Sequence, residues 1–393
     1  MGRMRDAINA LRGKKAPESA VTVTKTRADC IMTSREAIYA AVSRISTAIA
    51  SMPCHLYRGG VIQRNDPLER LLAYQPNCSM TGYIFRLTMQ ANVGLEGRAY
   101  ALIRPAGDGN PAALDVLDPM RVEPMRNTDD GEIWYRVNAE GAKQMWVHSS
   151  GMLVLKYLCT NGENGIRPTD VLRNTLEYDA QMKEFSKRQV QGTNTGVFLE
   201  TPSNVGKEQA LKLANDFLEV YTQTGKQVVM LQGGMKATQM QQSPLAQGSL
   251  DVERMTINRV ATVYNIPSHL LGDYGSTSFA SQEQQTLEFR TLTLLPIVTQ
   301  WEEELNQKLL TYDRCASGYS FRFDMDALTR ADTAARGDYY QKAVRSGWHT
   351  INDIRAKEFI APYERCGNTP LASKDLWPLE RLEKGDVNNG GKV

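Results

Sequence analysis

The sequence offers few residues whose types and spacing could catalyse a reaction. The segment NVGKEQ contains Gly206 and Lys207, but it lacks the earlier glycine of a phosphate-binding loop, and Glu208 stands where such a loop needs Ser or Thr to hold magnesium. Asp324 and Asp326 flank one apolar residue and could bind a metal, although carboxylates at a strand end more often cap the next helix. No GxSxG, HExxH or dinucleotide-binding pattern occurs. We therefore expect no catalytic residue.

The cysteines and histidines do not form a recognisable metal site. The six cysteines lie at positions 30, 54, 78, 159, 315 and 366 without a CxxC pair, and the four histidines are scattered. This spacing favours reduced thiols in a cytosolic setting over a disulfide framework or a zinc site. We expect neither a metal nor a cofactor.

A basic cluster, Lys183, Lys187 and Arg188, ends a long helical pattern. Lysines four residues apart share a helix face, so Lys183 and Lys187 could contact phosphates together, whereas Arg188 lies about 100° further round. Basic residues in a last helical turn also interact favourably with the helix dipole, which is an equally good explanation of the cluster. The net charge of +2 excludes nucleic-acid binding by bulk charge, so any DNA contact depends on local placement.

The spacing of apolar residues predicts the helices and strands that position these residues. Helical patterns at 34–50, 67–74 and 81–95 precede short runs rich in Val, Ile, Leu and Tyr, which predict a β-rich α+β domain ending near residue 165. A helix of roughly 23 residues follows from Pro168. A small βαββ insert comes next, with strands GVFLE, QVVML and MKATQM, and the chain returns to helix from about Leu250.

A loop at 270–281 joins this return helix to another long helix and is rich in Gly, Ser and Thr, which offer little apolar area to a core. The following helix carries a leucine-rich face and contains Pro296. Proline lacks the N–H that would bond to the carbonyl of Leu292, so a kink is expected there. A strand, YSFRF, and a final helical region complete the pattern.

The chain ends and the apolar runs carry further expectations. No run of 18 or more apolar residues exists, so we expect no membrane span. The basic N-terminus lacks the apolar stretch of a secretory signal and is expected to be a loosely held arm. The polar, glycine-rich C-terminus is expected to be flexible.

The order of elements resembles that of portal proteins from long-tailed bacteriophages. The segments that carry the resemblance include SREAIYAAVSRISTAIASMPCHLYR, LDPMRVEP, VYNIPSHLLGD, TLLPIVTQWEEELNQKLL and FDMDALTRADTAARGDYYQKAVRSGWHTINDIRAKE. It implies an α+β portal fold that forms a ring oligomer. The corresponding parts would be an N-terminal arm (1–30), a wing (31–167), a first stem helix (168–192), a clip (193–246), a second stem helix (247–269), a tunnel loop (270–281), a tunnel helix with a wing strand (282–326), a crown (327–368) and a flexible tail (369–393).

The resemblance also implies a function. It implies a dodecameric ring at one capsid vertex, held by the major capsid protein, through which double-stranded DNA is packaged and ejected without sequence specificity. The terminase large subunit and later a head-tail adaptor would dock on it, in the host cytoplasm during assembly and then in the virion. No catalysis is implied.

Particular residues receive roles by the same resemblance. Those of the tunnel loop would face DNA: Tyr274, Gly275, Ser276, Thr277, Ser278 and Phe279. The basic cluster would lie in the stem channel, and Pro296 would kink the tunnel helix. A polar face of the clip would meet partners: Lys207, Gln209, Lys212, Asp216 and Glu219.

Two other classes of protein remain open at this level. A different ring-forming virion component, such as an adaptor or capsid subunit, would share the assembly but not the helix–insert–helix order. An enzyme or regulatory protein with an unrecognised site would be a monomer or small oligomer with a pocket.

Overall fold

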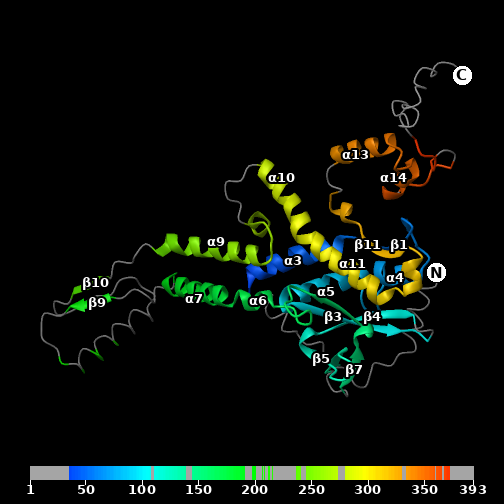
Figure 1. The fold of residues 1–393 in the computed structure, drawn as a ribbon. Coiled ribbons are helices and arrows are strands. Elements are labelled where there is room, and N and C mark those ends of the chain that lie inside the picture. Colours follow the sequence, from blue (N-terminus) through cyan, green and yellow to red (C-terminus); the bar gives the residue numbers. More distant parts are fainter. Residues whose placement is uncertain are drawn as a thin grey trace, which may run out of the picture. The chain divides into compact units, whose positions relative to one another are not determined.

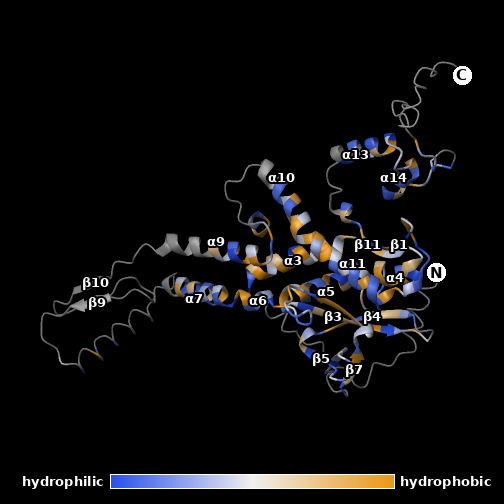
Figure 2. Ribbon diagram, viewed as in Figure 1, coloured by the Kyte–Doolittle hydropathy of each residue, from blue (hydrophilic) through white to orange (hydrophobic). Residues whose placement is uncertain are grey.

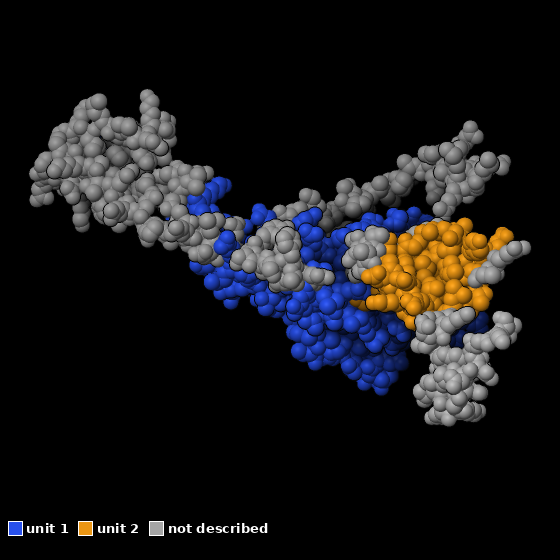
Figure 3. All heavy atoms as spheres, turned by 90° about the horizontal axis from the view of Figure 1, so that it is seen from above, with its two compact units in different colours: residues 1–50, 54–323 blue, residues 51–53, 324–393 orange. Residues whose placement is uncertain are grey.

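The computed structural model describes most of the chain between residues 35 and 371. The described ranges are 35–107, 110–138, 144–190, 197–200, 236–239, 245–272, 279–329, 333–358, 360–364 and 367–371, with residues 206, 208, 211, 212 and 215. The chain divides into two compact units (Figure 3). Unit 1 comprises 1–50 and 54–323, and unit 2 comprises 51–53 and 324–393.

Three helices begin the described part of unit 1: α3 (Glu36–Ser51), α4 (Pro67–Ala73) and α5 (Gly82–Glu96). Local sequence explains their ends, because Asp66 and Thr81 accept hydrogen bonds from free N–H groups of the first turns of α4 and α5. Buried Arg86 donates to the carbonyls of Leu72 at 3.1 Å and Ala50 at 2.9 Å. One guanidinium thus joins the C-terminal ends of α4 and α3 to α5.

Three antiparallel sheets of three strands follow the expected positions closely. Their orders are β11-β1-β2, β4-β3-β8 and β5-β6-β7. The strands are β1 (Cys54–Arg58), β2 (Val61–Ile62), β3 (Arg98–Pro105), β4 (Pro111–Leu117), β5 (Val122–Arg126), β6 (Ile133–Val137), β7 (Met145–His148), β8 (Met152–Lys156) and β11 (Tyr319–Phe323). Short 3-10 turns, Pro119–Arg121 and Ser149–Gly151, precede β5 and β8. Tyr100 and Tyr135, with ring centroids 5.5 Å apart, belong to one buried cluster that links the second and third sheets.

Helix α11 (Leu295–Leu309) packs on two of these sheets and covers their edges. Its Glu302 and Asn306 accept hydrogen bonds from the backbone N–H groups of Phe323 (2.8 Å) and Phe321 (2.6 Å) in β11. Glu304 accepts one from Val154 of β8 at 2.9 Å. Each of these strands lies at an edge of its sheet, so α11 satisfies donors that a further strand would otherwise pair with.

Two helices, α7 (Arg173–Val190) and α9 (Leu245–Val263), lie side by side (Figure 1). Hydrophilic residues dominate α7, whereas β3 is largely apolar (Figure 2). Between these helices, β9 (Val197–Glu200) pairs antiparallel with β10 (Lys236–Gln239). The expected strand QVVML lies outside the described residues.

The helix expected to be continuous from Pro168 is divided. A short helix, α6 (Pro168–Val171), ends at Leu172, whose N–H bonds back to the carbonyls of Asp170 and Pro168. Leu172 is only 2% exposed. The α-type bonds from Leu172 N–H to Pro168 and from Leu176 N–H to Leu172 cross this position, so only one residue interrupts the helix that the sequence predicts.

Unit 2 contains a 3-10 turn (Met325–Thr329) and the helices α13 (Thr333–Arg345) and α14 (Ile351–Lys357). The Asp324 carboxylate accepts the N–H of Asp326 at 3.1 Å, so it caps the turn that follows β11. Thr350 and Asp353 form a reciprocal capping box at the start of α14. None of the described helices is both long and apolar enough to cross a membrane.

Candidate functional site

The loop predicted to face DNA lies between a 3-10 turn, η3 (Ser268–Leu271), and helix α10 (Phe279–Glu288). Tyr274, Gly275, Ser276, Thr277 and Ser278 fall outside the described residues, and Phe279 is the first residue of α10. The two ends of the loop are therefore placed by the elements that flank it.

The turn that leaves α9 is anchored in the core of unit 1. Tyr264 is 1% exposed, and its hydroxyl donates to the carbonyl of Gly94 in α5 at 2.9 Å. Burial raises the pKa of Tyr264 far above its ordinary value, so this hydroxyl stays protonated and remains a donor. Tyr157 donates to the carbonyl of Val263 at 2.8 Å and packs edge-on against Tyr264. With buried Ile266, these contacts fix the end of α9.

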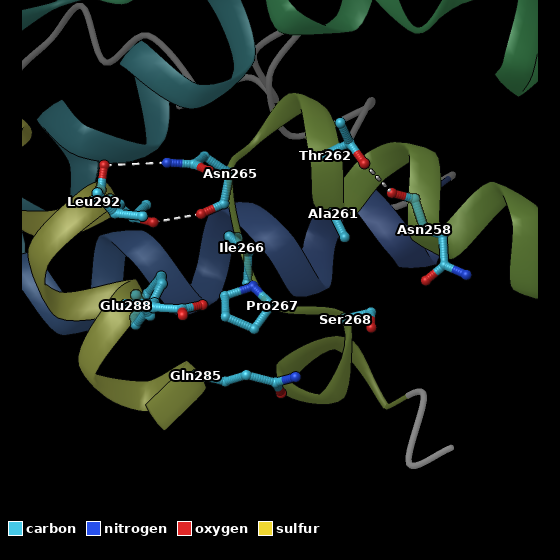
Figure 4. A pocket seen from close by; sticks show the side chains of 12 residues that line it. Asn258, Ala261, Thr262, Asn265, Ile266, Pro267, Ser268, Gln285, Glu288 and Leu292 are labelled. Carbon is cyan, nitrogen blue, oxygen red and sulfur yellow. Dashed lines mark hydrogen bonds between the residues drawn. The ribbon is translucent and has the colours of Figure 1, made fainter. Parts of the chain in front are cut away.

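Asn265 connects this turn to the next long helix (Figure 4). Its side-chain Nδ2 donates to the carbonyl of Leu292 at 3.1 Å, and its own carbonyl accepts the hydroxyl of Thr293. Asn265 has φ of 53°, the single left-handed conformation at a non-glycine residue in the described part of the chain. Sequence reasoning did not single it out, although asparagine directly after a helix is a recognised left-handed position.

The helix that follows is irregular just before Pro296. A π-helical segment, Phe289–Leu294, separates α10 from α11, and the N–H of Leu295 bonds to the carbonyl of Arg290. Pro296 lies in the first turn of α11. The change in hydrogen-bond pattern thus falls at the turn where Pro296 lacks an N–H.

A cavity of about 490 Å³ opens beside Asn265. It is lined by the end of α9, the turn and η3 on one side and by α10 and the π-helical segment on the other: Asn258, Ala261, Thr262, Asn265, Ile266, Pro267, Ser268, Gln285, Glu288, Phe289, Leu292 and Thr293. Glu288 is the one ionisable residue in this lining, so the cavity holds no acid–base pair. Across the described part of the chain, no three His, Cys, Asp or Glu side chains are grouped to hold a metal.

Nearby carboxylates reduce the positive charge that the basic cluster can offer to phosphates. Lys183 Nζ lies 3.4 Å from Asp179 and 3.6 Å from Glu36 of α3, so two carboxylates partly offset its charge, and the pair with Glu36, whose side chain is 90% exposed, is screened by solvent. Lys187 is exposed, and the side chain of Arg188 lies outside the described residues. The sequence pattern missed Glu36 because α3 lies far away along the chain.

The insert is described at few positions. Lys212 is helical and exposed, but its neighbour Leu211 is 65% exposed as well, so exposure does not distinguish a polar face here. Lys207, Gln209, Asp216 and Glu219 lie outside the described residues.

The fold formed by these elements resembles the folds of two solved structures. An HK97-family phage portal protein from Corynebacterium diphtheriae is 16% identical with a TM-score of 0.59, covering 78% of this chain and 97% of that one. A chain in the neck of a native gene transfer agent particle is 17% identical with a TM-score of 0.57, covering 91% and 99%. Both likenesses concern the fold.

Sequence comparison assigns the family. A family model described as "Phage portal protein" matches residues 36–358. The portal protein of Enterobacteria phage HK97 is 25% identical over 369 residues, which are 90% of this chain and 85% of that protein. A probable portal protein of Streptomyces phage phiC31 is 25% identical over 374 residues, 89% and 79% of the two chains. The chain belongs to the phage portal protein family.

Proposed function

We propose that this portal protein forms a ring of twelve copies at one capsid vertex and provides the channel for packaging and ejecting double-stranded DNA. The observation that carries the proposal is the helix pair α7 and α9 with a small β-unit between them, followed by α10 and α11, in a chain of the portal family. The similar neck of the native gene transfer agent particle was computed with C12 symmetry, which supports the copy number. Ring symmetry repeats each side chain around the channel, so the near-neutral chain can still present belts of charge.

Negative-stain images of the purified protein test the assembly. We expect rings with a central hole and a narrow projection formed by the insert at 193–246. Monomers or compact small oligomers at all protein concentrations would contradict the proposal. Rings without the projection would favour another class of virion connector.

The loop at 270–281 is proposed to face the moving duplex. A sequence-random substrate that slides favours weak, replaceable contacts, since fixed base-reading donors would hold the DNA. Replacing Ser276 and Ser278 with tryptophan is expected to impede packaging or DNA retention while rings persist. Alanine at both positions is the matched control and is expected to have a mild effect. Full-length DNA packaged and retained by the tryptophan variant would show that this loop does not line a constriction.

The basic end of α7 is proposed to contact phosphates from the channel wall. Because Asp179 and Glu36 offset Lys183, we infer that Lys187 contributes more to this contact. Lys187→Ala is therefore expected to change DNA retention more than Lys183→Ala, with a difference that shrinks as salt rises. Equal effects of the two variants at low salt would count against this assignment.

The insert is proposed to dock the terminase large subunit during packaging and a head-tail adaptor afterwards, and the wing to meet the major capsid protein. Charge reversal at Lys212 or Glu219 is expected to leave rings intact and weaken terminase binding. Packaging energy is proposed to come from that motor, not from the portal. ATP hydrolysis by purified rings that is lost on substitution of Lys207 would contradict this.

A further inference from the structure

The direction of α10 is set at one short junction. Side chains of α10 that the structure describes, such as Thr286, Leu287 and Glu288, are exposed. Burial begins at Thr293 and Leu294, which are 6% and 1% exposed, and continues into α11. The π-helical segment spans this boundary, so α10 projects from the last packed turn.

Asn265 makes two reciprocal hydrogen bonds at that boundary. In a regular helix the carbonyl of Leu292 would accept the N–H of residue 296, and proline has none. Asn265 Nδ2 donates to this same carbonyl at 3.1 Å, while the Thr293 hydroxyl donates back to the carbonyl of Asn265. The asparagine thus donates to a carbonyl whose regular α-helical donor position is occupied by Pro296.

The base of this connection is fixed, whereas the space beside it is open. Buried Tyr264 and Ile266 flank Asn265 and hold the turn to the core. The left-handed φ of 53° is accessible to asparagine and glycine at low cost. On the other side, the cavity of about 490 Å³ lies between the turn and α10, so the described side chains that line it leave space into which α10 can tilt.

We propose that Asn265 is a positioning residue, a latch that fixes the direction in which α10 leaves α11 by bonding the Leu292 carbonyl, whose regular α-helical donor position is occupied by Pro296. Opening the latch frees α10 to tilt over the adjoining cavity. This inference concerns the fold of unit 1 and holds whether or not the loop at 270–281 faces DNA.

Amide hydrogen exchange of the full-length protein tests the latch. Asn265→Gly keeps the left-handed turn and removes the side-chain donor, so it isolates the latch from backbone strain. We expect amides of 284–295 to exchange about 5-fold faster, the effect of losing roughly one net hydrogen bond. Amides of 298–309 are expected to be unchanged. The matched control is Asn258→Ala, which alters the lining of the same cavity and is expected to leave exchange at wild-type rates.

A double-mutant cycle with Pro296→Ala identifies the carbonyl as the target. Alanine restores an N–H to bond Leu292, so Asn265→Gly in that background is expected to accelerate exchange by less than about 2-fold. Unchanged exchange in Asn265→Gly, or an equal acceleration in Asn258→Ala, would overturn the latch. The same acceleration with and without Pro296 would overturn the pairing of Asn265 with Pro296. None of these outcomes depends on DNA packaging, so the proposed function succeeds or fails separately.

Discussion

Substitution of Glu302 tests whether α11 stabilises the edge strand β11 by accepting its backbone N–H groups. One oxygen of this carboxylate accepts the N–H of Phe323 at 2.8 Å, and the other accepts from the guanidinium of Arg322 at 2.9 Å. Phe323 is 8% exposed, so water could not replace Glu302 as the acceptor of its N–H. Removing the Glu302 carboxylate would leave this N–H without a hydrogen-bond partner, which costs about 1–3 kcal/mol. The Arg322 side chain is 63% exposed, so the ion pair contributes no more than about 1 kcal/mol.

Glu302→Leu removes both interactions, whereas Glu302→Gln removes the charge and keeps an acceptor for Phe323. We expect the leucine variant to lose about 2 kcal/mol of stability and the glutamine variant less than about 1 kcal/mol. Thermal unfolding is expected to show a midpoint lowered by roughly 4 °C for leucine and less than about 2 °C for glutamine. Equal shifts for the two variants, or wild-type exchange of the Phe323 amide in the leucine variant, would refute the reasoning.

Three further predictions concern buried polar groups. Arg86→Met leaves the carbonyls of Leu72 and Ala50 without their hydrogen-bond donor. Although this variant no longer has to bury a cation, we expect it to lose about 2 kcal/mol of stability, measured by thermal unfolding. An unfolding midpoint equal to that of the wild type would contradict this. Tyr264→Phe removes the bond to Gly94, so we expect a loss of about 1 kcal/mol and faster amide exchange at the end of α9; unchanged exchange would show that this hydroxyl does not anchor α9. Burial raises the pKa of Glu304 above its ordinary value of 4.5. The folded chain therefore binds this proton more tightly than the unfolded chain does. As a result, the stability of the fold decreases as the pH rises from 4.5 through the higher pKa of the folded chain. Glu304→Gln cannot ionise and is expected to show a smaller fall in unfolding midpoint between about pH 4 and 7; an equal fall would assign the pH dependence to other groups.

The strands and the helix caps could be predicted from the sequence because their causes are local. Alternation of apolar residues and nearby turn residues placed β3 to β8 and β11, and the Asp324 cap depends on a neighbour two residues away. The order of elements together with segments such as VYNIPSHLLGD indicated the family, which the comparisons confirmed.

The contacts that define the candidate site could not be predicted in the same way. Asn265 meets Leu292, and Lys183 meets Glu36, only after separate helices have packed. Periodicity assigns each residue to a face of its own helix but does not identify the neighbour on that face.

The pairing of β1 with β11 has a consequence for how the chain is made. The ladder joins Cys54 to Phe323, and β1 is the central strand of its sheet, with Leu56 fully buried. A ribosome adding about 5–20 residues per second would need roughly 13–50 s to reach β11 after β1 has emerged. Throughout that interval one side of β1 lacks its partner, which makes the nascent chain prone to pairing with another copy. During synthesis the first sheet therefore cannot be completed before residues 319–323 have left the ribosome.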